Sequence, residues 1–232
     1  MTLIVVIPAS DGIAMGSDSQ ITSGMVRTIG PKIRQLNDRC IWGASGELAL
    51  IQRVAEILEA LPDKNQYLFN LRDKAAELIK MHVETLLRLD FRTQFFHNDP
   101  NTLLSLHPGD FVFAEYGDEA RVLHILSNGT PEWIQWPFAS GGGELFAYAL
   151  LQKYQRKTLD VDRAMLLTFK VIEEAIEVGA YGLGPPIDIW KITAHGVKQL
   201  PESEIAALED ACRALREIEV SLLIRPVEGA QT

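Results

Sequence analysis

The sequence predicts an α+β protein built as a four-layer sandwich, in which two antiparallel sheets lie between two layers of helices. Two observations favour this class. Apolar runs and turn signals form β-hairpins at the start of the chain and again in its middle. Each group of hairpins is followed by two segments with the apolar spacing of amphipathic helices. Because sheets and helices each bury one apolar face, helices outside and sheets inside satisfy both.

The first hairpin is expected at the N-terminus. Residues 3–7 are a buried-strand run, Asp11-Gly12 is a turn signal, and residues 12–20 read as the returning strand. Such a hairpin brings Asp18 back beside Thr2. If Met1 is removed, a hydroxyl, a free amine and a carboxylate therefore gather at the start of the chain.

The second hairpin ends in a run of small residues. Residues 23–31 read as a loop with Gly-Pro punctuation, and residues 32–36 alternate as a strand. The chain returns over residues 39–44 and continues to Gly46. The small residues of Gly43-Ala44-Ser45-Gly46 predict a close approach of the backbone to another group.

The later elements repeat the alternation of helices and hairpins. Helical periodicity covers residues 47–61, which Pro62 terminates, and residues 71–89. The remaining expected elements, in chain order, are strands at 110–116, 121–126 and 132–138, helices at 144–157 and 162–178, a strand at 187–192, a short strand at 197–200 and a long amphipathic helix from 201. We expect one domain over residues 1–232, with residues 201–224 as a C-terminal helical extension.

Composition argues against several partners. The chain has 232 residues with 22 Lys and Arg against 31 Asp and Glu, a net charge of -9. No basic face is expected, so nucleic acid and anionic membrane surfaces are not predicted partners. No basic leader and no apolar run of membrane-spanning length occurs, and Cys40 and Cys212 lie in apolar patterns typical of buried thiols. These features predict a cytoplasmic protein.

No metal or other cofactor is predicted. The irregular segment 91–109 contains His97 and His107, but their spacing matches no standard set of metal ligands. His82 lies on the apolar stripe of the second helix, where a structural histidine is the expected interpretation. We therefore expect the 91–109 segment to be a surface or interface loop.

Five features in order resemble a known family. They are Thr2, Gly16 to Thr22, Lys32-Ile33-Arg34, Gly43 to Gly46, and Ala139 to Gly142. Together with the element order over residues 2–200, they resemble the proteasome β-type subunits, which belong to the N-terminal nucleophile hydrolases. The resemblance includes the bacterial homologues HslV, Anbu and the β-proteobacterial proteasome homologue. The glutamine at position 20 resembles HslV. The 91–109 segment and the C-terminal helix resemble HslV less.

The resemblance implies a catalytic group around Thr2. A threonine hydroxyl needs a base, and an α-amine has a pKa of about 7.7–8.0, close to working pH. Once Met1 is removed, both groups belong to Thr2. A charged Lys32 would lower the pKa of this amine further, and Asp18 would keep Lys32 charged and oriented.

The resemblance also implies an oxyanion donor and a substrate cleft. The backbone N–H of Gly46 would stabilise the tetrahedral oxyanion, and Ser140 would bond near the Thr2 amine. Strand-edge backbone would bind an extended peptide as an added strand. The residues expected to contact substrate are Gln20, Thr22, Ala44 and Ser45, and Arg34 is expected beside them at the first specificity pocket.

The implied function is a self-compartmentalised threonine peptidase that acts on polypeptides inside a homo-oligomeric ring, with an AAA+ unfoldase as a possible partner. One feature departs from the family pattern. An Asp and a Ser commonly follow the fourth helix, but Gly179-Ala180-Tyr181-Gly182 occupies that stretch here, and the nearest acids are Glu177 and Asp188. This departure leaves open a catalytically weak or inactive ring subunit that is structural or binds peptides. A third possibility is an N-terminal nucleophile amidase acting on a small molecule.

Overall fold

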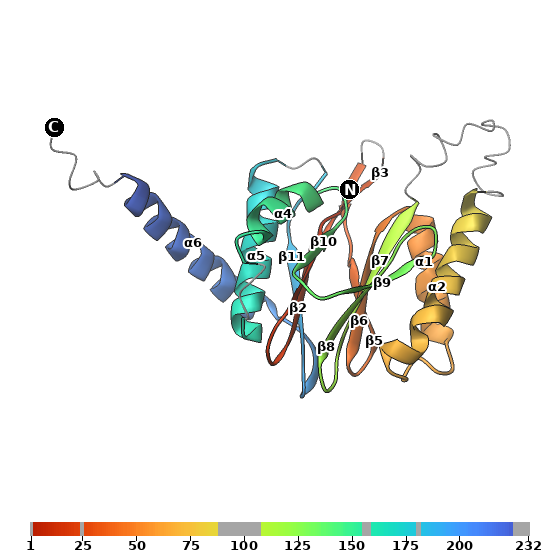
Figure 1. Ribbon diagram of the computed structural model, residues 1–232. Helices are drawn as coiled ribbons and strands as arrows, with labels where there is room; N and C mark the ends of the chain where they lie inside the picture. Colours follow the sequence, from red (N-terminus) through yellow and green to blue (C-terminus); the bar gives the residue numbers. More distant parts are fainter. Residues whose placement is uncertain (1, 24–25, 88–107, 155–158, 180–181, 225–232) are drawn as a thin grey trace.

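The computed structural model describes residues 2–23, 26–87, 108–154, 159–179 and 182–224. Met1, His97, His107, Ala180 and Tyr181 lie outside the described residues. The predicted four-layer α+β sandwich is confirmed. Figure 1 shows the strands in the middle of the molecule, with α4 and α5 on one side and α1 and α2 on the other.

The first sheet contains the N-terminal hairpin. Its strands are antiparallel and stand in the order β10-β1-β2-β11-β12. Their bounds are Phe138–Ser140 (β10), Ile4–Pro8 (β1), Gly12–Asp18 (β2), Ile187–Thr193 (β11) and Gly196–Gln199 (β12). The chain start is therefore an inner strand, hydrogen-bonded on both sides.

The second sheet is also antiparallel and follows chain order, β5-β6-β7-β8-β9. Its strands are Ile33–Asn37 (β5), Cys40–Gly46 (β6), Gly109–Tyr116 (β7), Ala120–Ile125 (β8) and Pro131–Ile134 (β9). A separate two-stranded ribbon consists of β3 (Gln20–Ser23) and β4 (Val26–Ile29).

Three apolar clusters hold the layers together. One lies between the sheets and includes Ile4, Met15, Ile41 and Val112. A second joins the first sheet to α4 (Glu144–Leu151) and α5 (Val161–Glu177), and a third joins the second sheet to α1 (Leu48–Ala60) and α2 (Leu68–Thr85). Helix α5 is capped by Asp160, whose side chain accepts a hydrogen bond from the Arg163 N–H.

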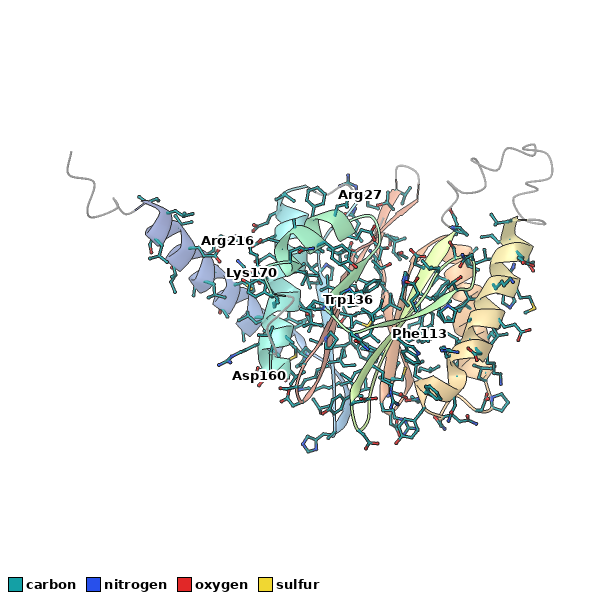
Figure 2. The ribbon with its side chains drawn as sticks, viewed as in Figure 1. Arg27, Phe113, Trp136, Asp160, Lys170 and Arg216 are labelled. Atoms are coloured by element: carbon teal, nitrogen blue, oxygen red, sulfur yellow. The ribbon has the colours of Figure 1, made fainter. Side chains whose placement is uncertain are left out.

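The long C-terminal helix α6 (Glu202–Ile224) leaves the body of the molecule along its outer half (Figure 1). Its inner half packs on α5 through buried Cys212, and Arg216 pairs with Glu173 and Glu177. Figure 2 shows Lys170 and Arg216 at this junction. Burial raises the pKa of the Cys212 thiol to about 11, in keeping with the predicted structural role of this residue. None of the described helices is long and apolar enough to cross a membrane.

Four expected elements were placed or bounded wrongly. Residues 132–138, predicted as one strand, form β9 in the second sheet and β10 in the first, with Trp136 between them and 48% exposed. The predicted loop 23–31 contains β4, whose apolar residues Val26 and Ile29 are exposed and so give no burial pattern.

The two remaining corrections concern helix bounds. Helix α2 begins at Leu68 and not Leu71, because the Leu68 N–H is satisfied by the Glu115 carboxylate at 2.9 Å. Helix α4 ends at Leu151, well before the expected residue 157, and residues 155–158 are not described. Neither glycine nor proline marks either boundary, so the sequence carried no local signal for them.

Candidate active site

Thr2 is held by hydrogen bonds of its own backbone and of its neighbour. The N–H of Leu3 donates to Oδ1 of Asp18 at 2.9 Å, and the Thr2 carbonyl accepts from the Gly143 N–H at 3.4 Å. The next residue, Ile4, pairs with Ser17 on one side and Ser140 on the other. The chain start is thereby placed at the end of an inner strand, as the hairpin interpretation predicted.

Asp18 forms the centre of a buried hydrogen-bond network. Its carboxylate accepts from Lys32 Nζ at 2.6 Å and from the N–H groups of Leu3, Gln20 and Gly184 at 2.9, 3.3 and 3.2 Å. Asp18 is fully buried and Lys32 is 6% exposed. Such a charge is stable away from water only when paired and fully hydrogen-bonded, and this carboxylate satisfies both conditions.

Burial lowers the pKa of Lys32, and the adjacent Asp18 carboxylate partly opposes this shift. The ion pair therefore keeps a lysine charged at a position where desolvation alone would favour the neutral amine. Lys32 thus places a positive charge at the floor of the site.

A cavity of about 650 Å³ opens over this network. This volume falls within the range of roughly 300–1,000 Å³ that is typical of ligand pockets. Six of the sequence-predicted site residues line it, namely Thr2, Thr22, Lys32, Ala44, Ser45 and Gly46. Arg34, expected at the specificity pocket, also lines it. The ends of β1 and β10 from the first sheet thus meet β5 and β6 from the second.

Three predicted site residues do not line the cavity. Asp18 lies beneath Lys32, as described above. Gln20 donates from Nε2 to Thr22 Oγ1 at 3.3 Å and packs against Gly184, so it supports the wall of the cavity without forming its surface. Ser140 is 2% exposed on β10, opposite Ile4, and its Oγ has no hydrogen-bond partner among the residues described here. Ser140 is the last residue of β10, beyond the expected strand end at residue 138.

Two glycines are required by the local backbone. Gly46 has φ +130° and a side-chain carbon there would lie 2.3 Å from the Pro108 carbonyl oxygen. Gly141 has φ +105° and would bring such a carbon within 2.2 Å of the Thr2 carbonyl oxygen. Both positions exclude other residues sterically, and both lie in the cavity wall.

Sequence reasoning missed the backbone donors around the site. Gly184 follows α5 and donates to Asp18, while Gly143 donates to the Thr2 carbonyl. The glycines of Gly182-Leu183-Gly184 and of Gly141-Gly142-Gly143 were the available signals, since glycine permits close backbone approach. The nearest acids bond other groups. Glu177 accepts a hydrogen bond from Arg216, and Asp188 accepts from Trp190 and Gln199.

No group of three or more His, Cys, Asp or Glu side chains arranged to hold a metal occurs within the described ranges.

Comparison with known proteins identifies the family of this arrangement. The sequence profile described as Proteasome subunit matches residues 2–185, which include every predicted site residue. The chain belongs to the proteasome subunit family. The resemblance to proteasome β-type subunits seen in the sequence motifs is confirmed.

Several relatives of this proteasome family member are archaeal β subunits. Proteasome subunit beta of Nanoarchaeum equitans is 26% identical over 86% of this chain and 97% of its own length. Proteasome subunit beta 1 of Pyrobaculum calidifontis is 27% identical over 83% of this chain and 90% of its own length.

The fold is shared with a solved bacterial structure. Anbu (ancestral beta-subunit) from Yersinia bercovieri superposes with a TM-score of 0.72 over 99% of this chain and 100% of the Anbu chain, at 15% identity. This likeness confirms the predicted N-terminal nucleophile hydrolase fold. That residues 1–232 are one domain with an extension from residue 201 stays a prediction.

Proposed function

We propose that this proteasome-family chain is an N-terminal threonine peptidase, with Thr2 as the nucleophile after removal of Met1. One observation carries the proposal: Thr2, Lys32 and Gly46 line the same cavity, and buried Asp18 bonds both Lys32 and the N–H that follows Thr2. Because these groups come from both sheets, their meeting at one point is a property of the whole fold.

The proposed reaction uses the hydroxyl and amine of Thr2. The Thr2 Oγ attacks the scissile carbonyl carbon while its proton passes to the α-amine, and the resulting oxyanion is stabilised by the Gly46 N–H. When the carbon–nitrogen bond breaks, the leaving amine takes this proton and an ester on Thr2 remains. Water then attacks the ester with the α-amine again as base, which releases the acid and restores Thr2.

Lys32 and Asp18 act on the amine in this scheme. A charged ammonium close to the α-amine lowers the pKa of that amine and keeps it neutral, which is the state of a base. Asp18 fixes Lys32 through the 2.6 Å contact and holds the Leu3 N–H, so nucleophile and cation are positioned by the same carboxylate. Ser140 precedes Gly141, which lines the cavity, and is proposed to bond the free amine of Thr2.

We further propose a cytoplasmic homo-oligomeric ring that encloses the site and acts on unfolded polypeptides, with an AAA+ unfoldase as a partner. The β-subunit names of the relatives support this assembly. Exposed apolar side chains on α4, including Leu145 at 79% and Phe146 at 45%, support a buried interface there. The net charge of -9 gives no support to nucleic-acid or membrane partners.

A second candidate is a ring subunit that binds peptides without cleaving them. It is favoured by the buried Ser140 Oγ, which has no partner among the described residues, and by the loop after α5, which contributes a backbone N–H to Asp18 where the family pattern has side chains. If the Thr2 α-amine lacked its hydrogen-bond partners, the cavity could still bind a peptide, but the rate of peptide hydrolysis would fall.

Hydrolysis of fluorogenic peptides by the wild type and by Thr2→Ala tests the proposal, with Thr85→Ala on the exposed face of α2 as the matched control. Intact mass establishes whether Met1 has left. We expect Thr85→Ala to match the wild type and Thr2→Ala to lose at least about 1,000-fold in kcat/KM. Equal cleavage by Thr2→Ala would refute the mechanism, and a native mass equal to one chain would refute the ring. Cleavage of small amides alone would favour the amidase alternative.

A further inference from the structure

A histidine lies between two carboxylates behind the wall of the cavity. His124, on β8, stands opposite Glu132 of β9 on one side and opposite Val112 of β7 on the other. Its Nδ1 atom is 3.8 Å from Glu132 Oε2, and its Nε2 atom is 3.9 Å from Asp110 Oδ1. The Glu132 side chain is 52% exposed, whereas Asp110 lines the cavity. The three titratable groups therefore form a row from the protein surface to the cavity.

Both contacts in this row are longer than ordinary hydrogen bonds. Nε2 of His124 is shielded from solvent and has no hydrogen-bond partner among the described residues. A neutral imidazole donates from only one of its nitrogens, whereas an imidazolium donates from both. Protonation of His124 therefore supplies a donor to each carboxylate, and each contact can shorten into a charge-assisted hydrogen bond.

The surroundings of His124 make its charge depend on these two acids. Phe138 of β10 lies against the imidazole with 4.9 Å between ring centres, and Val112 belongs to the apolar cluster between the sheets. Burial lowers the pKa of His124, and the charges of Asp110 and Glu132 oppose this shift. A histidine placed in this way changes its charge within a few pH units of neutrality.

Asp110 lies close to the proposed oxyanion donor in the register of the second sheet. In the β6–β7 ladder, Ser45 pairs with Asp110 and Gly46 pairs with Gly109. Asp110, Gly46 and Thr2 all line the cavity. A carboxylate in this wall disfavours a second negative charge nearby, so it opposes formation of the oxyanion. Neutralising Asp110 from behind removes that opposition.

We propose that His124 is a proton-dependent switch for the charge of the cavity wall. The protonated imidazole hydrogen-bonds Asp110 through Nε2 and offsets its negative charge, whereas the neutral imidazole leaves a full carboxylate in the cavity. The expected effect on rate rests on the proposed peptidase function. The pairing of His124 with Asp110 does not depend on catalysis and is measured separately.

Hydrolysis of one fluorogenic peptide by the wild type and by Asp110→Asn, at pH 8 and at pH 5, measures the switch. At pH 8 His124 is neutral, so we expect Asp110→Asn to raise kcat/KM by about 3- to 30-fold, because it removes a charge several ångströms from the oxyanion. At pH 5 the imidazolium already offsets Asp110, so the same substitution should change kcat/KM by less than about twofold. Because the two proteins are compared at each pH, Glu47 and Glu144, which line the same cavity, contribute equally to both.

The same comparison in the His124→Gln background shows whether the histidine is responsible. There the effect of Asp110→Asn on kcat/KM should be equal at pH 8 and pH 5 within about twofold, because the switch is absent. Asp118→Asn, in the exposed connection between β7 and β8, is the matched control and should leave kcat/KM at its wild-type value at both pH values. An effect of Asp110→Asn that does not depend on pH in the His124 protein, or a dependence that survives in His124→Gln, overturns the proposal.

Nuclear magnetic resonance of the histidine rings tests the pairing without catalysis. The chain has five histidines, so ¹³C-labelled histidine gives few signals, and His124→Gln identifies the signal of His124. We expect the midpoint of its titration to fall by about 0.5 pH unit or more in Asp110→Asn, because the lost carboxylate favours the charged ring. Asp118→Asn should keep the wild-type midpoint. If none of the proteins cleaves peptides, a lowered midpoint in Asp110→Asn would support the switch while the peptidase function fails. Equal midpoints in the wild type and Asp110→Asn would reject the switch as well.

Discussion

The two sheets contribute different kinds of group to one cavity. The first sheet positions residue 2 through backbone contacts: β2 supplies Asp18, which holds the Leu3 N–H, and the turn after β10 supplies Gly143. The second sheet supplies side-chain charge, with Lys32 just before β5 and Arg34 on it. Residue 2 is therefore held by groups of the first sheet and its α4 connection, while the cations that line the cavity come from the second sheet.

The ion pair between the two sheets gives the largest expected effect on stability. Asp18→Ala should cost about 3–5 kcal/mol of unfolding free energy, because it leaves buried Lys32 without its carboxylate and three N–H groups without an acceptor. Lys32→Met should cost less, since Asp18 keeps its N–H donors. Chemical denaturation measures both values.

Asp162→Ala is the matched control for this pair, because Asp162 is 80% exposed on α5 and only 3.8 Å from Lys191. Its expected cost is about 0.3–1 kcal/mol, the loss of one acid near a helix N-terminus. A larger loss of unfolding free energy in Lys32→Met than in Asp18→Ala would show that the cation, and not the carboxylate, organises the network.

Substitutions at Gly46 and Gly179, both with positive φ, compare a glycine in the cavity wall with a glycine outside it. Gly46→Ala should lower kcat by about 100- to 1,000-fold, because the added carbon meets the Pro108 carbonyl and displaces the proposed oxyanion donor. Gly179 also has positive φ, +73°, but a side-chain carbon there would have no heavy atom within 4 Å. Gly179→Ala should lower stability by about 1 kcal/mol and leave kcat unchanged. Similar kinetics for the two variants would remove Gly46 from the mechanism.

The smallest expected effect concerns His124 on β8 of the second sheet. It is 8% exposed, and burial lowers its pKa although Asp110 and Glu132 oppose the shift. The unfolded chain therefore binds a proton more readily than the folded chain, so stability falls as pH drops below about 6.5, the ordinary histidine pKa. His124→Gln should flatten this decline between about pH 7 and pH 5 in unfolding measurements. His195, an exposed turn residue, provides the control variant His195→Gln. If unfolding free energy falls with pH equally steeply in both variants, His124 is not the source of the decline.

The layers of the fold could be predicted because they depend on local patterns. Buried apolar runs, the Asp11-Gly12 turn and helical periodicity each act over a few residues, and all agree with the sandwich. The segment 132–138 was wrongly predicted as one strand, because Phe138 is buried against Tyr148 and His124, contacts that no local pattern reports. Strand β4 was missed because its apolar residues, Val26 and Ile29, are exposed.

The site was predictable in its side chains and not in its backbone. Thr2, Lys32 and Gly46 were found by their order, whereas the N–H donors of Gly143 and Gly184 carry no side chain to signal a role. That these residues catalyse peptide hydrolysis stays a prediction.

Covalent labelling of the N-terminal threonine is the most direct test of whether Thr2 is a nucleophile after removal of Met1. The protein is treated with a β-lactone peptidase inhibitor, and intact and tandem mass spectrometry locate the product. We expect a chain that lacks Met1 and carries one ester adduct on Thr2, absent from Thr2→Ala and retained in Thr85→Ala. A chain that keeps Met1, or a processed chain that forms no adduct at Thr2, would contradict it.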